Sequence, residues 1–262
     1  MTVDEICRLM RESERKAAAL MLQAHDILAE CKSGARDVVT AYDRRVQELL
    51  TEELRAALPE AHFFCEEMDA REKLDSEQLF IIDPIDGTMN FVRGFSHSCI
   101  AVAYASRGTV LAAAVYNPYL DEMFHAVRGG GTFLNGRPVR CAADDLSGSV
   151  VCFGTSPYCP ELSDRTFSLA RSLFERSLDL RREGTAELDL CSVAAGRAGL
   201  YFELYLSLWD YAAGALLVEE AGGVCATAEG GPLPLTDGKS SVVAAANETV
   251  MREYLRIAGA KP

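Results

Sequence analysis

An apolar run that ends in two aspartates, a proline and a glycine constrains this chain more than any other segment. Residues 79–82 are Leu-Phe-Ile-Ile, the composition of a buried strand, and residues 83–88 are Asp-Pro-Ile-Asp-Gly-Thr. Pro84 has a fixed φ and biases the residue before it toward extended geometry. We therefore expect Asp83 to end the strand and the next residues to turn, which brings the carboxylates of Asp83 and Asp86 near one point.

Two carboxylates held at one point indicate a bound cation. Like charges this close raise each other's pKa unless a cation neutralises them, and no Lys or Arg lies between Leu74 and Met89. Carboxylates and the Ile85 carbonyl are hard oxygen ligands that suit Mg²⁺. Gly87 permits close backbone approach, and Thr88 can begin a helical turn whose free N–H groups bind an anion. The alternative is an ordinary solvated turn, since Asp-Pro and Asp-Gly are common turn dipeptides.

The string over residues 81–91 resembles the signature of the inositol monophosphatase family, which are metal-dependent and typically lithium-sensitive phosphomonoesterases. A second segment, Trp-Asp-x-x-Ala-Gly at residues 209–214, is similar to the family's second signature and lies about 120 residues further along. Taken alone, Asp210 would be a helix cap. The resemblance implies an α+β fold, built as a layered α/β/α/β/α sandwich, and a homodimer.

The length of 262 residues and a hydrophobic content of 49% allow a large core, in one compact unit or two closely packed halves. A composition shift at residues 142–148 marks a plausible boundary. We expect an N-terminal α+β half, residues 1–145, with most of the metal ligands. The C-terminal α/β half, residues 146–262, would supply substrate contacts and the last metal ligand.

Charge and cysteine content exclude several classes of function. The net charge is −13, and the basic residues form no cluster beyond pairs such as Arg181-Arg182, so nucleic acid and anionic membrane are not expected partners. The nine cysteines are scattered without a Cys-x-x-Cys pair, which favours free thiols in a reducing compartment over disulfides or zinc. The N-terminus is charged from Asp4 onward and has no apolar signal core. These features predict a cytoplasmic protein.

Hydrophobic periodicity predicts alternating helices and strands along the chain. We expect a long helix over residues 3–31 with Gly34 as its C-terminal cap, and a second helix after residues 38–40. Polar residues 68–78 form a connection, and Asn135-Gly136 marks a hairpin. Further strands are expected at residues 61–65, 98–106, 109–116, 122–127, 150–153, 177–180, 200–206 and 241–245, and further helices at 161–178, 187–198, 211–221 and from 247.

Other candidate site residues are less specific when taken alone. Glu66 and Glu67 follow a predicted strand, so only one of them is expected to face a common site with Asp83. The resemblance selects Glu66, as a metal ligand that also activates water. Asp43 is a charge in the first turn of a helix, where the dipole favours it. The resemblance assigns it to a further, weaker metal and the surrounding water.

The C-terminal half supplies the expected substrate contacts. Gly184, Thr185 and Ala186 open a helix and would be only a helix cap without the resemblance, which assigns this turn to the substrate's hydroxyl-bearing ring. Glu203 lies on an apolar strand, where an unpaired acid is costly unless it binds something. The resemblance assigns it to substrate hydroxyls. The family's usual Ala-Asp before this strand is Ala198-Gly199 here, a departure in the contact set.

The resemblance implies hydrolysis of inositol monophosphate to inositol and phosphate by metal-activated water, with two or three Mg²⁺ ions, the third of them near Asp43. The first ion would bind Glu66, Asp83 and the Ile85 carbonyl, and the second would bind Asp83, Asp86 and Asp210. Thr88 and Glu66 would orient the water, Gly87 and Thr88 N–H groups would bind phosphate, and Asp210, Glu203 and residues 184–186 would contact the alcohol.

Two alternatives stay open at the sequence level. Related phosphatases act on fructose 1,6-bisphosphate, NADP(H), histidinol phosphate or a 3′-phosphoadenosine nucleotide, and a panel of substrates distinguishes them. A noncatalytic module that binds metal and polyol phosphate belongs to a different class. It predicts loss of a ligand or of the water-orienting threonine, and all of these residues are present.

Overall fold

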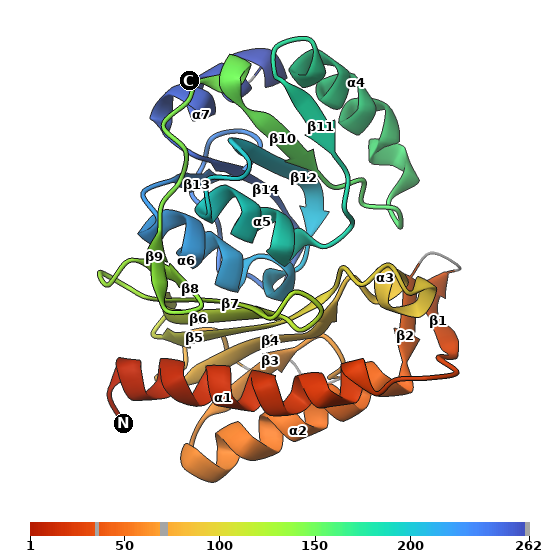
Figure 1. The fold of residues 1–262 in the computed structure, drawn as a ribbon, viewed down its shortest axis with the longest axis vertical. Coiled ribbons are helices and arrows are strands. Elements are labelled where there is room, and N and C mark those ends of the chain that lie inside the picture. The colour runs from red at the N-terminus through yellow and green to blue at the C-terminus, as the bar shows by residue number, and fades with distance from the viewer. Residues whose placement is uncertain (35–36, 69–72, 260–262) are drawn as a thin grey trace.

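The computed structural model describes residues 1–34, 37–68 and 73–259 of the chain. Helices and sheets stack in five layers, which Figure 1 shows from bottom to top: α1 with α2, a seven-stranded sheet, α5 with α6, a five-stranded sheet, and α4 with α7. The predicted α+β class and the layered α/β/α/β/α order are confirmed. None of the described helices combines the length and apolarity needed to cross a membrane.

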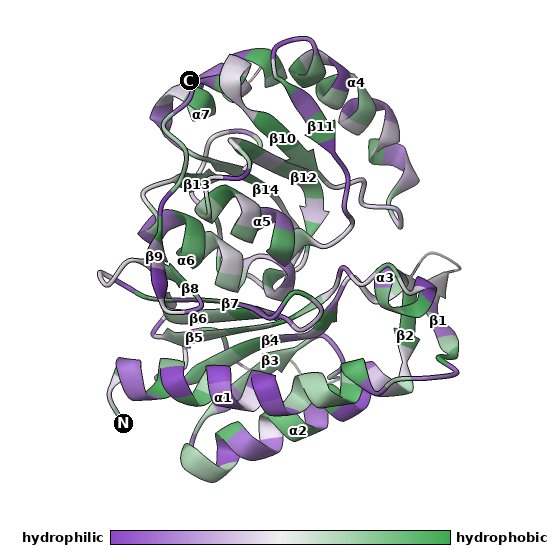
Figure 2. Ribbon diagram, viewed as in Figure 1, coloured by the Kyte–Doolittle hydropathy of each residue, from purple (hydrophilic) through white to green (hydrophobic). Residues whose placement is uncertain are grey.

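Amphipathic helices cover the outer face of each sheet. They are α1 (Val3–Leu22) and α2 (Ala41–Ala57) on one side, and α4 (Ser163–Phe174) and α7 (Glu248–Ala258) on the other. Apolar residues of α1, such as Met10 and Met21, are buried, and Figure 2 shows hydrophobic and hydrophilic residues recurring along the helix. Two polar residues of the helix, Ser13 and Glu14, are buried as well. This periodic pattern is the signal that identifies such helices from sequence.

The seven-stranded sheet follows the order of the chain and is antiparallel except between its first two strands. Its strands are β3 (His62–Cys65), β4 (Leu79–Asp86), β5 (Cys99–Ser106), β6 (Thr109–Asn117), β7 (Glu122–Val127), β8 (Thr132–Leu134) and β9 (Arg137–Val139). The predicted Asn135-Gly136 hairpin joins β8 to β9, and both turn residues have positive φ, as such a two-residue turn requires.

The five-stranded sheet has the order β11-β10-β12-β14-β13 and mixes parallel with antiparallel pairs. Its strands are β10 (Val150–Phe153), β11 (Asp179–Arg181), β12 (Leu200–Leu206), β13 (Val224–Ala226) and β14 (Ser240–Ala245). The composition shift at residues 142–148 lies between β9 and β10, where the chain passes from one sheet to the other and forms the short 3₁₀ helix η1 (Leu146–Gly148).

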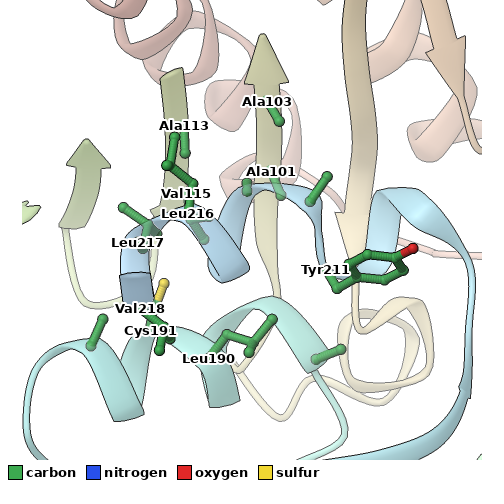
Figure 3. Close-up of a cluster of buried hydrophobic side chains, with 14 of the residues drawn as sticks. Ala101, Ala103, Ala113, Val115, Leu190, Cys191, Tyr211, Leu216, Leu217 and Val218 are labelled. Carbon is green, nitrogen blue, oxygen red and sulfur yellow. The ribbon is translucent and has the colours of Figure 1, made fainter. Parts of the chain in front are cut away.

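Two short helices form the middle layer, α5 (Ala186–Ala194) and α6 (Ala212–Glu220), and they are buried between the sheets. Figure 3 shows Leu216 beside Ala113 and Val115 of the first sheet, and Val218 beside Cys191 of α5. Small side chains on the sheet let the helices approach closely. A helix that is apolar on all sides fits only such a buried position, so one continuous core joins both sheets.

The predicted helix over residues 3–31 is wrong beyond α1. The helix ends at Leu22 with Gln23 as its C-cap, and Asp26 beyond it has a left-handed φ of +50°. Leu28, part of the expected apolar stripe, is 83% exposed. Strand β1 (Ala29–Gly34) pairs antiparallel with β2 (Asp37–Thr40), so Gly34 belongs to a strand and is not a helix cap. Strand pairing has overridden the helical pattern here.

The prediction that Asp83 ends its strand is also wrong, because β4 continues to Asp86. Its pairing with β5 is irregular between Asp83 and Asp86. An irregular step of this kind tolerates Pro84, which cannot donate to a regular ladder. The predicted helical turn at Thr88 is confirmed as α3 (Thr88–Arg93).

Most other predicted elements are confirmed with shifted ends. The helix expected over residues 161–178 is α4 preceded by the 3₁₀ helix η2 (Pro160–Leu162), and α5 ends earlier than predicted. The 3₁₀ helix η3 (Leu208–Asp210) precedes α6, and β13 was missed. Within the connection at residues 68–78, residues 69–72 lie outside the described part of the chain.

Candidate active site

A cleft of about 550 Å³ lies where the end of β4 meets α3, the start of α5 and η3. It receives side chains from both sheets and from the middle layer. Every predicted site residue except Asp43 lines it: Glu66, Asp83, Ile85, Asp86, Gly87, Thr88, Gly184, Thr185, Ala186, Glu203 and Asp210. Residues far apart in sequence are therefore brought together at one opening.

Four carboxylates line the cleft and repel one another: those of Glu66, Asp83, Asp86 and Asp210. Burial raises the pKa of Asp83 and of Asp86 well above the usual range, and neighbouring carboxylates raise both further. Burial together with the charge of Glu66 raises the pKa of Asp210 to about 7. Removing charges from water is costly unless an opposite charge or a metal compensates them. The cluster is thus an unfavourable arrangement for the protein alone.

The donor set fits a divalent metal ion. Among the described residues, no three His, Cys, Asp or Glu side chains already form a closed ligand set, and no Cys or His lines the cleft. The available donors are carboxylates, hydroxyls and the Ile85 carbonyl. Mg²⁺ does not need a closed protein cage, because it usually binds one or two carboxylates and completes its shell with water and phosphate oxygens.

Lys32 of β1 forms ion pairs beside this carboxylate cluster. Its Nζ lies 2.7 Å from Glu66 Oε1 and also pairs with Glu67. Because β3 ends at Cys65, the two acids lie in a turn and the expected strand alternation does not apply to them. Glu66 lines the cleft, whereas the N–H of Glu67 donates to Gln47 of α2.

Asp43 lies behind the cleft in the first turn of α2. Its Oδ2 accepts from the backbone N–H of Thr40 at 2.8 Å and from the Thr40 hydroxyl at 2.5 Å, so it forms a capping box. The Thr88 hydroxyl lies 3.2 Å from Asp43 Oδ1 and 3.1 Å from the Ile85 carbonyl oxygen. A hydroxyl has one proton, so its lone pairs stay free to accept from water in the cleft.

Gly87 is required where the corner after β4 passes the segment before α5. It has a φ of +84°, and a Cβ there would lie 2.6 Å from Thr185 Oγ1. Thr185 donates its hydroxyl to the His97 carbonyl oxygen at 2.9 Å, and the Asn90 side chain donates to the same oxygen at 2.8 Å. Thr185 thus fixes the contact between the two segments, in addition to lining the cleft.

Carboxylates also cap the two buried helices. Asp86 Oδ2 accepts from the backbone N–H of Glu187 at 2.7 Å, in the first turn of α5. Glu187 in turn accepts from the N–H of Gly214 at 2.6 Å and of Ala213 at 3.3 Å, in the first turn of α6. Asp210 accepts from the Ser207 N–H at 2.6 Å. The dipoles of both helices favour these negative charges.

Glu203 on β12 is held by three donors. Its Oε1 accepts from the backbone N–H of Ser156 at 2.8 Å and from the Ser156 hydroxyl at 3.0 Å, and its Oε2 accepts from the Tyr201 hydroxyl at 2.9 Å. A Cβ on Gly154 would overlap this carboxylate. The buried acid is therefore satisfied by the protein and fixed at the wall of the cleft.

Sequence reasoning missed four charged residues of the cleft: Lys32, Arg182, Asp189 and Lys239. Arg182 was noted only as part of a basic pair, although its place just before the Gly-Thr-Ala turn could have indicated it. Asp189 follows Glu187 on a helix whose sequence is otherwise apolar. Lys239 is an isolated charge in a loop, and nothing in the local pattern points to the cleft.

Comparison with known proteins gives matches over nearly the whole chain. A profile of the Inositol monophosphatase family matches residues 3–260. The chain is 38% identical to the Nus factor SuhB of Pasteurella multocida, covering 92% of this chain and 91% of that protein. It is 40% identical to the inositol-1-monophosphatase of Rhizobium meliloti, covering 78% and 77%.

Solved structures agree with the sequence matches. The extragenic suppressor protein suhB of Bartonella henselae superimposes with a TM-score of 0.90 at 33% identity, covering 97% of this chain and 98% of that chain. An IMPase/NADP phosphatase solved with Mg²⁺ and phosphate has a TM-score of 0.84 at 25% identity, covering 97% and 94%. Both family signatures face the cleft of this chain, which belongs to the inositol monophosphatase family.

Proposed function

We propose that this protein is a Mg²⁺-dependent phosphatase that hydrolyses a small phosphate monoester, with inositol monophosphate as the first substrate to test. One observation carries the proposal. Four mutually repelling carboxylates lie at the base of a cleft beside the Gly87–Thr88 corner, where backbone N–H groups are available to an anion. Such a site favours a metal ion and a phosphate together.

The residues that would hold two Mg²⁺ ions are Glu66, Asp83, Asp86, Asp210 and the Ile85 carbonyl, with Asp43 beside a third. When bound, the ions lower the pKa of water and neutralise charge on the phosphoryl group and leaving oxygen. The relative solved with Mg²⁺ and phosphate supports this choice of metal. The carboxyl pKa values, raised by burial and by one another, support it independently.

The chain's own groups orient the reactants. Thr88, whose proton is donated to Asp43 or to the Ile85 carbonyl, accepts a hydrogen bond from the attacking water and directs its lone pair toward phosphorus. The N–H groups of Gly87 and Thr88 bind the phosphate. Glu203 and the turn of Gly184, Thr185 and Ala186 bind hydroxyls of the alcohol. Water attacks phosphorus and forms a new P–O bond while the ester P–O bond breaks. One proton of the water stays on the phosphate and the other passes to the leaving oxygen, so that the alcohol and phosphate leave.

Relatives differ in the substrates named for them. One is named inositol-1-monophosphatase, and a dual IMPase/NADP phosphatase has been solved with D-inositol-1-phosphate and with NADP and Ca²⁺. Fructose 1,6-bisphosphate, histidinol phosphate and 3′-phosphoadenosine nucleotides stay alternatives for this chain, as does a noncatalytic binding module. Homodimer formation, lithium sensitivity and a cytoplasmic location are further predictions that follow from the sequence and the resemblance.

The test is release of inorganic phosphate from myo-inositol 1-phosphate at neutral pH, with Mg²⁺ and with excess EDTA. We expect fast release that EDTA abolishes, and loss of that release in Asp83→Asn. The control variant is Asp179→Asn, an exposed aspartate on β11 whose carboxylate does not line the cleft. Absent release from inositol 1-phosphate and from all the alternative phosphates, with Mg²⁺ binding intact, would instead favour the noncatalytic module.

A further inference from the structure

The loop of residues 154–159 joins β10 to η2 and contributes Tyr158 to the lining of the cleft. The loop is fixed to β12 through Glu203, because the Ser156 N–H and hydroxyl donate to Glu203 Oε1 at 2.8 Å and 3.0 Å. The path of this loop is therefore set by the carboxylate that is assigned to hydroxyls of the alcohol.

Ser156 has a strained backbone. Its φ is +40°, in the left-handed region that residues other than glycine seldom adopt. Such a conformation persists only where the surrounding structure holds it, and it is common at functional sites. The two bonds to Glu203 hold it here. The strain indicates that this loop does more than connect β10 to η2.

A tight turn places Tyr158 at the tip of the loop. The Cys159 N–H donates to the Ser156 carbonyl oxygen at 2.9 Å, which closes a four-residue turn with Pro157 and Tyr158 at its centre. Proline favours the first central position, because its φ is already fixed near the value that the turn requires. The position of Tyr158 is thus determined by backbone geometry.

The hydroxyl is the buried end of the Tyr158 side chain. The residue as a whole is 44% exposed, yet burial is the largest cause that raises the pKa of its hydroxyl above the usual range. The ring is accordingly the exposed part, and the hydroxyl points inward. The ring centroid lies 5.9 Å from Lys239 Nζ, an attraction that limits the rotamers of the ring.

The surroundings of Tyr158 place it between Glu203 and Asp210. The turn that carries it is bound to Glu203, and the Lys239 that its ring contacts also lies 5.8 Å from the ring of Trp209, the residue before Asp210. The charges of Asp210 and Glu203 raise the pKa of the hydroxyl after burial does, which agrees with this placement.

The Tyr158 hydroxyl is available as a hydrogen-bond donor. No residue in the described part of the chain accepts a hydrogen bond from it. It stays protonated at neutral pH, because burial and the nearby carboxylates oppose its ionisation. Asp210 and Glu203 are the two carboxylates assigned to the alcohol, so the free donor faces the place where the alcohol would bind.

We propose that Tyr158 is a further catalytic residue, whose hydroxyl donates a hydrogen bond to the ester oxygen that leaves phosphorus. The inference rests on the proposed phosphatase function and adds a contact to it. The hydrogen bond stabilises the negative charge that develops on this oxygen as the ester P–O bond breaks. The phenol keeps its own proton, and the leaving alcohol still receives its proton from the attacking water.

Dependence on the leaving group tests the inference. Tyr158→Phe removes the hydroxyl and keeps the ring. We expect its single-turnover rate of phosphate release from inositol 1-phosphate to fall about tenfold or more, because an alkoxide is a poor leaving group. The rate with p-nitrophenyl phosphate should change little, because p-nitrophenolate leaves without such help. An unchanged rate with inositol 1-phosphate would overturn the inference, and so would an equal loss on both substrates.

Tyr104→Phe is the matched control. Tyr104 lies on β5 outside the cleft, and its ring centroid is 5.3 Å from that of Phe80. This variant should leave the ratio of the two rates as it is in the wild type. If Tyr104→Phe lowers the ratio as much as Tyr158→Phe does, loss of a hydroxyl acts through the fold and the inference is wrong.

A binding measurement separates this inference from the proposed function. Calorimetric titration with inositol 1-phosphate and Ca²⁺ in place of Mg²⁺ needs no turnover, and a relative was solved with NADP and Ca²⁺. If the wild type releases no phosphate from any substrate, the phosphatase proposal fails and the Kd decides the contact. A Kd that rises about threefold to tenfold in Tyr158→Phe, the value of one hydrogen bond, would retain the contact with the ester oxygen. An unchanged Kd would overturn it as well.

Discussion

Glu14 is a buried carboxyl group that lies outside the cleft, on α1, and both of its oxygens lack a hydrogen-bond partner in the part of the chain that the structure describes. Burial raises its pKa well above the usual range, and the charge of Glu187 raises it further. The folded protein therefore keeps this group protonated at pH values where the unfolded chain has already ionised it. Glu14 is a local cost to stability at neutral pH.

Glu14→Gln should stabilise the protein, and more so as the pH rises. Below the unfolded pKa of about 4.3 both states are protonated and the change is near neutral. Above it, the wild type loses about 1.4 kcal/mol of unfolding free energy per pH unit until the folded pKa is reached, whereas glutamine does not titrate. Urea unfolding at pH 5 and pH 8 measures this. Glu12→Gln, at an exposed position of the same helix, is the control. A benefit that is equal at the two pH values would contradict the prediction.

Gly154 determines the position of Glu203, because any Cβ at this site overlaps the Glu203 carboxylate. In Gly154→Ala the carboxylate must move away from Ser156 and Tyr201, so we expect KM for a polyol phosphate to rise about tenfold, the value of one or two lost hydrogen bonds. Steady-state kinetics measures the change. Gly231→Ala is the control, since its Cβ would meet no atom closer than 3.4 Å. An unchanged KM in Gly154→Ala would show that Glu203 does not bind substrate.

Among single residues, the cleft residues that belong to a short motif could be predicted from the sequence. Those that come together from distant segments could not. The Asp-Pro-Ile-Asp-Gly-Thr string indicated a metal and phosphate corner, and its carboxylates do line the cleft. Lys239 reaches the same cleft from a loop before β14, and its partners Tyr158, Tyr205 and Trp209 come from three other segments. Only tertiary structure brings such a group together.

Among elements, the crossing of α5 and α6 explains why the second family signature ends in glycine. A Cβ on Gly214 would lie 2.5 Å from the Leu190 Cβ and 2.6 Å from Glu187 Oε2. Gly214→Ala should therefore destabilise the protein by about 1–3 kcal/mol through overpacking, despite the higher helix propensity of alanine. Chemical denaturation measures the loss.

A double-mutant cycle identifies the cause of this loss. Leu190→Ala alone should cost about 2–5 kcal/mol, as a cavity in the core does. Combined with Gly214→Ala it should cost slightly less than the sum of the two changes, because alanine removes the Leu190 Cδ1 atom that lies 2.6 Å from the new methyl group, although it keeps the Leu190 Cβ. Strict additivity would mean that the Leu190 Cδ1 atom is not the obstacle, which leaves the Leu190 Cβ and Glu187 Oε2.

The ends of elements were harder to predict than their existence. The helical spacing of apolar residues in the sequence continues to residue 31. This spacing gives no reason for the helix to end at Leu22. After the cap at Gln23 the chain continues into the pairing between β1 and β2, which local periodicity does not contain. The strand β12, by contrast, has the predicted bounds, because Gly199 and Ser207 flank a run that is apolar except for Glu203.

In the whole molecule, the helices of the middle layer connect the cleft to both sheets. Asp86 comes from the first sheet and caps α5, Glu187 of α5 caps α6, and Asp210 ends the 3₁₀ helix η3 two residues before α6. The acidic residues of the cleft are thus fixed to the core through hydrogen bonds to buried helices. Metal binding is consequently expected to be coupled to global stability, since the same carboxylates serve both.

Mg²⁺ should stabilise the protein more at pH 8 than at pH 5.5. Without metal, Asp83, Asp86 and Asp210 bind protons in the folded state at pH values where the unfolded chain has lost them, because burial and mutual repulsion raise their pKa values, that of Asp210 to about 7. Metal-free stability therefore falls as the pH rises above about 4 and continues to fall through about 7. Bound Mg²⁺ compensates the ionised carboxylates and reduces this slope, adding about 2.7 kcal/mol when its concentration is 100 times its Kd.

Melting temperatures with Mg²⁺ and with EDTA across this pH range measure the difference. Asp83→Asn should remove most of it and Glu14→Gln should retain it, whereas a Mg²⁺ effect that shrinks as the pH rises would mean that these carboxylates do not bind the ion.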